Sequence, residues 1–237
     1  MISVAILPHV LLAAAHGAIV IWMVRLWRTK QAPGDLLIAT ICGTIAYDNL
    51  ITMVAILTNV ESLLDTMIGL RWAMHAIFTP VMMIVILEIA AAAGNKFVTR
   101  PAIRAAVWIT VLLFSGKGVV VDLMNFDMGI PAIDALTKGI GAQLATLITE
   151  ALILVLGIDL WRRRNWPWMF IGGITMLVVA ITRPVVLGVN LGNEGAIILL
   201  VAFAFSSARF AKTGRPDTYS DFVTSASEIA EPETESS

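Results

Sequence analysis

Ionisable side chains stand inside the most apolar part of this sequence. Arg71 and His75 lie four residues apart in "RWAMHAIFTP", a spacing that puts both on one face of a helix. An imidazole that a carboxylate orients can act as a general acid or base, and Asp48 or Glu150 could orient His75. An arginine nearby could stabilise developing negative charge. One function that these residues permit is therefore an intramembrane enzyme acting on a hydrophobic substrate such as a lipid or isoprenoid, with His75, Asp48 and Glu150 as its catalytic residues.

The other function that these residues permit is binding without reaction. The cations could donate charge-assisted hydrogen bonds to a small anion or to a lipid head group. The sequence does not separate a binding or sensing protein from an enzyme, because no nucleophile is evident beyond water, a threonine or a serine. The predicted ligand-binding set is Arg71, His75, Asp48, Asn49, Lys117, Arg183 and Glu194.

The composition identifies the elements that must position these groups. Apolar residues make up 58% of the 237 residues and charged residues 14%, whereas soluble domains carry about 25% charged residues. A membrane-spanning helix needs about 20 mainly apolar residues. The sequence predicts an all-α integral membrane protein with seven spans, at about 2–27, 36–58, 66–93, 103–124, 137–160, 167–189 and 194–211. Residues 1–212 would form one bundle, and the acidic, Ser/Thr-rich segment 213–237 a disordered tail.

The basic residues predict the orientation of the spans. Twelve of the 16 Lys and Arg residues follow predicted span one, three, five or seven, and all of these segments lie on the same side of a seven-span bundle. Lys and Arg accumulate on the cytoplasmic side of membrane proteins. We therefore expect the N-terminus outside and the C-terminus in the cytoplasm, and a bacterial inner membrane as the location.

Helix geometry predicts that the ionisable residues share one depth. Counting about 1.5 Å per residue from the predicted span ends places them between the mid-plane and the outer third of the membrane. A charge that faces lipid costs several kcal/mol, so such groups normally face the bundle interior. We expect a polar cavity that is open, or nearly open, to the outside. The alternative is that these residues are ion pairs that lock the helices together without binding anything.

Histidine and cysteine usage bears on cofactors and partners. His9, His16 and His75 could together hold a metal ion, but none belongs to a tight ligand motif such as His-x-x-x-His, so the sequence predicts no metal. The single cysteine, Cys42, permits no internal disulfide. The net charge of −1 gives no indication of nucleic-acid binding. The expected partners are the lipid bilayer, a lipid-like or small anionic ligand, and a second copy of the chain in a possible homo-oligomer.

Two stretches of the sequence resemble the microbial rhodopsins. In "RWAMHAIFTP", Arg71, Thr79 and Pro80 fall on an arginine, threonine and proline of that family's third helix. In "RPVVLGVNLGNEG", Pro184 and Glu194 fall on the proline of its sixth helix and on an outer glutamate. The resemblance covers about 25 of the 237 residues. It implies a seven-helix bundle with its N-terminus outside, which agrees with the predicted spans.

The departures from that family concern the chromophore. The predicted seventh span contains no retinal-binding lysine, and Arg209 lies at its cytoplasmic end, where arginine cannot form a Schiff base. The counterion carboxylate falls on Met74 and its neighbouring tryptophan on His75. The resemblance therefore implies a rhodopsin-like protein without covalent retinal.

The aromatic residues of the retinal pocket are also replaced in helix six. The family's tryptophan falls on Ala180 and its tyrosine on Arg183. A further alternative is a photoreceptor whose Schiff base has moved to Lys117, because a desolvated lysine can react with an aldehyde.

Overall fold

The computed structural model describes the backbone of residues 2–58, 61–127, 140–182, 185–186, 189–190 and 196–211, and side chains within 6–54, 56–57, 73–74, 76–120, 144–179, 181–182 and 196–211. The described residues form seven α-helices and one pair of short strands. The helices are α1 (Ile2–Lys30), α2 (Pro33–Thr58), α3 (Glu61–Ala92), α4 (Pro101–Asp127), α6 (Ile140–Arg164), α7 (Trp168–Thr182) and α8 (Ala196–Phe210). Strands β1 (Val185–Val186) and β2 (Val189–Asn190) pair antiparallel.

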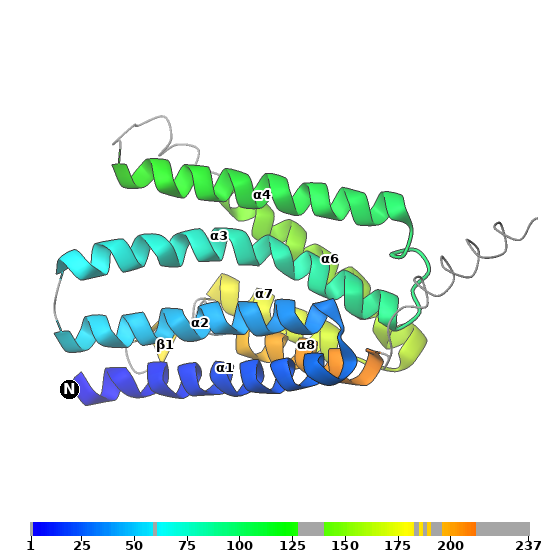
Figure 1. Ribbon diagram of the computed structural model, residues 1–237, viewed down its shortest axis with the longest axis horizontal. Coiled ribbons are helices and arrows are strands. Elements are labelled where there is room, and N and C mark those ends of the chain that lie inside the picture. The colour runs from blue at the N-terminus through cyan, green and yellow to red at the C-terminus, as the bar shows by residue number, and fades with distance from the viewer. Residues whose placement is uncertain are drawn as a thin grey trace, which may run out of the picture.

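Consecutive helices run in alternate directions, as Figure 1 shows. The N-terminal end of α1 and the strand pair therefore lie at one end of the bundle. The connections from α1 to α2, from α3 to α4 and from α6 to α7 lie at the other end, which we call the basic end because residues 25–30, 96–104 and 162–164 bring Lys and Arg there. The predicted gathering of cations at one end of the helices is thus present in the structure.

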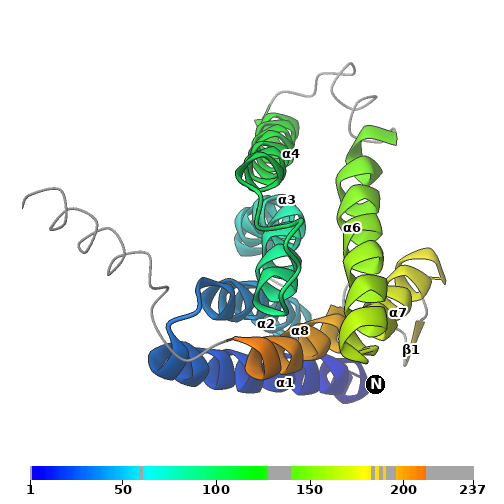
Figure 2. The ribbon, with the colours of Figure 1, turned by 90° about the vertical axis from the view of Figure 1, so that its right-hand side faces the viewer.

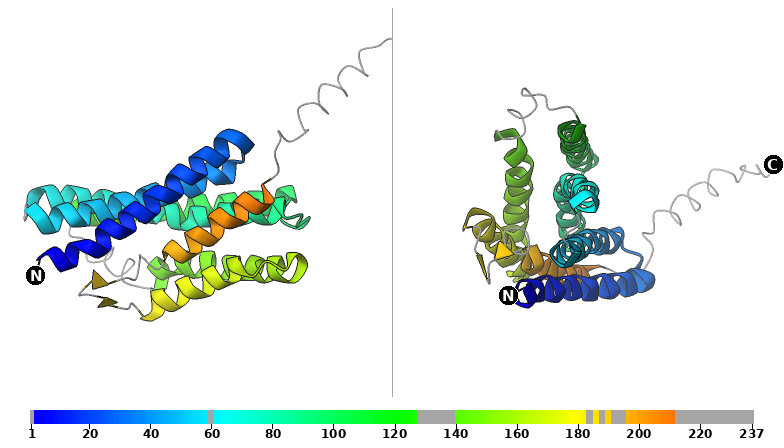
Figure 3. Two further views of the ribbon diagram at one scale, coloured as in Figure 1. Left: turned by 90° about the horizontal axis from the view of Figure 1, so that it is seen from below. Right: turned by 90° about the vertical axis from the view of Figure 1, so that its left-hand side faces the viewer.

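The helices from α1 to α4 pack side by side in a row, and α8 connects the α6–α7 pair back to the start of that row. Each helix from α1 to α4 packs on the next, α3 also contacts α6, and α6 and α7 lead to α8, which returns to α1, α2 and α3. Figures 2 and 3 show α2, α3 and α4 stacked in one row, with α6 standing beside it and α8 next to α1. The main contacts of α4 are with α3. The helix therefore has a free flank that faces α6.

The core lies in the half of the bundle nearer the basic end. Its buried residues come mainly from α2, the second half of α3, and α8, with Ile38, Ile86, Leu199 and Phe203 almost fully enclosed. More than half of α8 is buried, including small residues such as Ala202 and Ala204. The most enclosed helix of the bundle is thus one of its shortest, at 15 residues.

The outer surface of the bundle is apolar. Four segments are long and apolar enough to cross a membrane: Ile6–Lys30, Pro33–Val54, Pro101–Val120 and Leu144–Arg164. Large hydrophobic side chains such as Leu113 and Ile181 are exposed on these and neighbouring helices. A soluble protein rarely exposes contiguous apolar surface on this scale. The chain is a multi-pass helical membrane protein, and the predicted all-α architecture with seven helices is confirmed for the described residues.

One predicted helix boundary is wrong. The sixth span was expected at 167–189, but α7 ends at Thr182 and Val185–Asn190 contains the two paired strands. Pro184 comes two positions after Thr182, and helices usually end at or before the residue that precedes a proline. The second stretch that resembles the rhodopsins therefore includes a strand pair where a continuous helix was expected.

Close helix approaches occur where glycine leaves room. At Gly157 on α6, an added Cβ would lie 2.8 Å from the backbone nitrogen of Phe170 on α7, and at Gly118 on α4 it would lie 2.7 Å from the Cβ of Ala76 on α3. Small residues allow membrane helices to approach closely enough for extensive van der Waals contact. Near Gly118, the Ser115 hydroxyl donates to the Ile77 carbonyl at 3.3 Å, in the turn that precedes Pro80.

Candidate functional site

The first group of buried polar side chains joins α1 to α2. The Asn49 amide nitrogen donates to the Ile45 carbonyl at 2.9 Å, which leaves the Asn49 Oδ1 atom facing His9 Nδ1 at 3.0 Å. Because this oxygen can only accept, His9 Nδ1 carries the proton and donates. Both residues are buried. The pair is a hydrogen bond between two helices inside the apolar region.

His16 lies two turns further along α1. Its Nδ1 atom is 2.8 Å from the carbonyl of Leu12 on the same helix, and the residue is fully buried. Its Nε2 atom has no hydrogen-bond partner within the described part of the chain. His9 and His16 therefore bond to different partners. No group of three metal-ligating side chains occurs among the described residues, which do not include the side chain of His75.

Glu150 occupies a second place, between α6 and α7. The residue is 6% exposed, and its Oε1 atom lies 3.1 Å from the point where a Cβ on Gly173 would stand. Neither this oxygen nor the hydroxyl of the adjacent Thr149, which is also buried, has a hydrogen-bond partner among the side chains and backbone that the structure describes. A methyl group at Gly173 would be crowded there, so the glycine lets α7 approach a buried carboxylate oxygen with unused hydrogen-bonding capacity.

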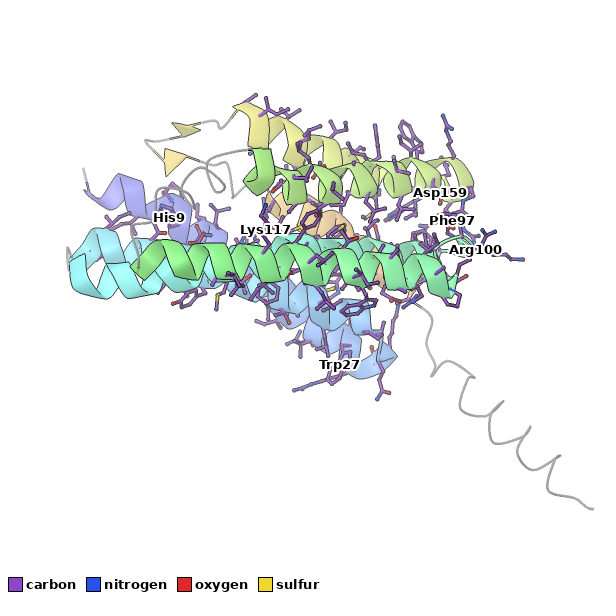
Figure 4. All side chains as sticks on the ribbon, turned by 90° about the horizontal axis from the view of Figure 1, so that it is seen from above. His9, Trp27, Phe97, Arg100, Lys117 and Asp159 are labelled. Atoms are coloured by element: carbon purple, nitrogen blue, oxygen red, sulfur yellow. The ribbon has the colours of Figure 1, made fainter. Side chains whose placement is uncertain are left out.

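The other predicted site residues are distributed over the bundle. Asp48 is half-buried on α2, next to Asn49, and Lys117 is exposed on α4 rather than enclosed among the helices. Figure 4 labels His9 on α1 and Lys117 on α4, and Figure 1 shows these two helices at opposite sides of the bundle. The remaining predicted site residues have side chains outside the described set, namely Arg71, His75, Arg183 and Glu194.

The described members of the predicted set therefore occupy separate places. Asn49 lies at the α1–α2 contact, Glu150 at the α6–α7 contact and Lys117 on the surface of α4. A single cavity lined by all of them is not seen in this part of the chain.

The chain matches no protein-family model, no curated protein and no solved structure. The resemblance to microbial rhodopsins accordingly rests on the two sequence stretches alone.

The basic end contains a polar network that the sequence did not predict. Asn95, in the connection from α3 to α4, donates to Asp159 on α6 at 2.8 Å, and its own Oδ1 accepts from the backbone N–H groups of Phe97 and Val98. Arg163 binds the same carboxylate through two nitrogens, with 2.6 Å from Nε to Oδ1. One carboxylate thus fixes the α3–α4 connection against α6.

Two further contacts strengthen this junction. The Arg164 Nε atom donates to the Ala93 carbonyl at 2.6 Å, and its guanidinium fills the space beside Gly94, whose φ of +89° favours glycine. Glu88 on α3 forms an ion pair with Arg104 on α4. Both carboxylates at this junction are therefore already paired with an arginine.

The end of α8 is held by side chains from two other connections. The Ser207 hydroxyl donates to Asp35, which is fully buried at the start of α2, and the Lys30 ammonium donates to the Ala208 carbonyl at 2.6 Å. Trp166 donates from its indole nitrogen to Ser206 at 2.7 Å. Sequence reasoning missed Asp35 because an acidic residue in the first turn of a helix is ordinary, and nothing local links it to α8.

A groove runs between α4 and α6 at the basic end. Its cavity volume is about 730 Å³, and its walls come from the end of α3, the α3–α4 connection, the first turns of α4 and the second half of α6. The polar residues Asn95, Lys96, Asp159 and Arg163 line one end. Figure 4 shows Asp159, Phe97 and Arg100 together at this end of the molecule. The apolar lining consists of Leu87, Phe97, Val98, Ile103, Val107, Leu152, Val155 and Leu156.

Proposed function

We propose that the protein is a membrane-embedded binding or sensing protein, and that Glu150 holds the polar group of its ligand. The observation that carries this proposal is the buried Glu150 carboxylate oxygen without a hydrogen-bond partner among the described residues. An ionisable residue inside a membrane protein is costly and usually marks a functional site. A ligand that donates a hydrogen bond to Glu150 would remove that cost.

The chemistry of the site favours a ligand with a hydroxyl or ammonium group. Glu150 offers an acceptor, and the neighbouring Thr149 hydroxyl can accept as well. Leu147, one turn before Glu150, and Ile174, next to Gly173, are exposed apolar residues on the bilayer-facing surface. A lipid-like molecule could lie along this surface with its polar head at Glu150.

A small anion, the other ligand that the sequence suggests, would need several cations around one point. Lys117 is exposed on α4, away from the α6–α7 contact, and so lends no support to an anion site shared with Glu150. The described residues therefore favour a hydrogen-bond donor over an anion.

We further propose that the scaffold is related to the microbial rhodopsins but holds no covalent retinal. The order of helix contacts supports this proposal, since the chain passes from neighbour to neighbour and α8 returns to α1. The absence of lysine from the sequence of α8 supports the second part, because the Schiff base of that family needs one. On this proposal the N-terminus is outside and the basic end is cytoplasmic, as the distribution of Lys and Arg favours.

The test combines ligand identification with thermal stability. We expect the protein purified from native membranes to retain a lipid-like molecule with a hydroxyl or amine, detectable by mass spectrometry. Glu150→Leu should lose that molecule, and the empty variant should be at least as stable in detergent as the empty wild type, because the unpaired buried carboxylate has gone. Leu147→Met, one turn away on the exposed surface, is the control and should retain the molecule.

Two outcomes would contradict the proposal. If Glu150→Leu retains the same molecules as the wild type, Glu150 does not bind them. If Glu150→Leu instead destabilises the empty protein strongly, Glu150 is part of a structural ion pair. A co-purified molecule that the wild type, but not the variant, converts chemically would favour the enzyme.

A further inference from the structure

The groove between α4 and α6 has the form of a site for one lipid chain. Ile103 and Val107 on α4 face Leu152 and Val155 on α6 across it, and Val155 is 63% exposed although it lines the groove. From Leu152 to Asp159 the wall is about 10 Å long, counting 1.5 Å per residue. In a membrane, an open apolar groove of this kind is in contact with lipid chains.

The polar end of the groove carries positive charge that no carboxylate among the described residues neutralises. Lys96 lines the groove, and Arg162 lies seven residues after Val155, on the same face of α6. Neither has a carboxylate partner within the described ranges, and the guanidinium of the nearby Arg100 lies over the ring of Phe97, 5.4 Å from its centroid. The carboxylates of Glu88 and Asp159 are already bound to arginines. The groove therefore joins an apolar channel to a cluster of available cations.

From these observations we propose that the groove binds an anionic glycerophospholipid from the leaflet at the basic end. One acyl chain lies between α4 and α6, and the phosphate interacts with Lys96 and Arg162. Basic pockets between membrane helices attract anionic lipid head groups. Phe97, 54% exposed at the mouth, is an aromatic side chain of the kind that occupies the head-group level. This site is independent of the proposed ligand at Glu150, which lies at the α6–α7 contact.

Bound lipid has a structural consequence for α4. The helix packs mainly on α3. Among the described residues, the hydrogen bonds nearest to it that reach α6 come from the α3–α4 connection, between Asn95 and Asp159 and between Arg164 and Ala93. A lipid chain in the groove fills the space between α4 and α6 and links the two helices along their length. Anionic lipid should therefore stabilise the protein, because a ligand that binds only the folded state raises its stability.

The experiment uses the full chain, delipidated in detergent. Phosphatidylglycerol, phosphatidylcholine or inorganic phosphate is added, and native mass spectrometry and thermal unfolding are recorded. Phosphatidylglycerol should bind and raise the Tm, whereas phosphatidylcholine should bind about tenfold more weakly and inorganic phosphate should have no effect. The variant Lys96→Gln/Arg162→Gln should weaken phosphatidylglycerol binding about tenfold. Val155→Phe, which fills the groove from an exposed position, should weaken both lipids.

The matched control is Arg25→Gln/Arg28→Gln. It removes the same charge from the same end of the bundle, at exposed positions of α1 away from the groove, and should leave lipid binding unchanged within about twofold. Equal losses in the two double variants would show general attraction to a charged surface and overturn the site. Equal binding of both lipids, a full effect of inorganic phosphate, or a dimer that Val155→Phe dissociates would also overturn it.

Discussion

The imidazole Nδ1 of His9 donates a hydrogen bond to the side-chain oxygen of Asn49 across the α1–α2 contact, at 3.0 Å. Replacing either residue alone leaves the other polar group buried without its partner, whereas replacing both leaves no unpaired polar group at this contact. We predict that His9→Phe and Asn49→Leu are each destabilising and that a double-mutant cycle gives a coupling of about 0.5–2 kcal/mol. Reversible unfolding in mixed micelles measures the four variants.

The control for this cycle is His16, on the same helix. Its Nδ1 bonds to the Leu12 carbonyl of α1 and not to α2. A cycle of His16→Phe with Asn49→Leu should therefore give a coupling near zero. If the coupling free energy for His16 and Asn49 were as large as that for His9 and Asn49, the coupling would not come from the His9–Asn49 hydrogen bond.

A second prediction concerns the glycine at the α6–α7 contact. Gly157→Ala should destabilise the protein by about 1–3 kcal/mol, because the new methyl group would meet the backbone of Phe170 and the helices would have to separate. Gly116→Ala on α4 is the matched control, since nothing lies within 4 Å of its added Cβ. It should be neutral or stabilising by up to about 1 kcal/mol. Similar unfolding midpoints for the two variants would exclude close packing at Gly157.

Topology gives a third prediction. A reporter fused to the C-terminus should be active in the cytoplasm, and one inserted after residue 60 should be translocated, because the cations of the basic end favour the cytoplasmic side. Paired alkaline phosphatase and green fluorescent protein fusions measure both positions. A cytoplasmic signal at residue 60 would reverse the orientation, and with it the leaflet assigned to the groove.

Retinal provides a fourth prediction. Added all-trans-retinal should give no visible absorption band that survives washing and reacts with hydroxylamine, because the sequence of α8 contains no lysine. If retinal did give a stable absorption band, Lys117 would be the residue to examine as the site of the Schiff base. It is exposed on α4, so a Schiff base there would lack the enclosed pocket that protects one from water. A stable band that Lys117→Ala abolishes would establish the photoreceptor.

The positions of the helices could be read from the sequence because each depends on local composition. Apolar runs of sufficient length predicted all seven, and the starts and ends differ from the structure by only a few residues except after Thr182. The early end of α7 also has a local cause, the proline at position 184. Apolar composition extends the expected span beyond Pro184, whereas a proline usually ends a helix at or before the residue that precedes it.

The site was harder to predict because it depends on helix rotation and on partners far apart in the chain. Depth along a helix follows from counting residues, but the direction of a side chain around the helix does not. Asn49 and Glu150 were predicted to lie in one layer, yet each faces a different neighbouring helix. The Asp35–Ser207 contact joins residues 172 positions apart, and no local pattern indicates it.

The burial of α8 has a consequence for biosynthesis. Residues 196–210 are translated after all the other described helices, yet they supply side chains to the centre of the core against α1, α2, α3 and α7. Until this segment leaves the ribosome, the earlier helices face a vacant position that lipid or an insertion chaperone has to fill. Chains that stop before residue 196 would therefore lack the centre of the core, and the other helices could complete their packing only after α8 is released.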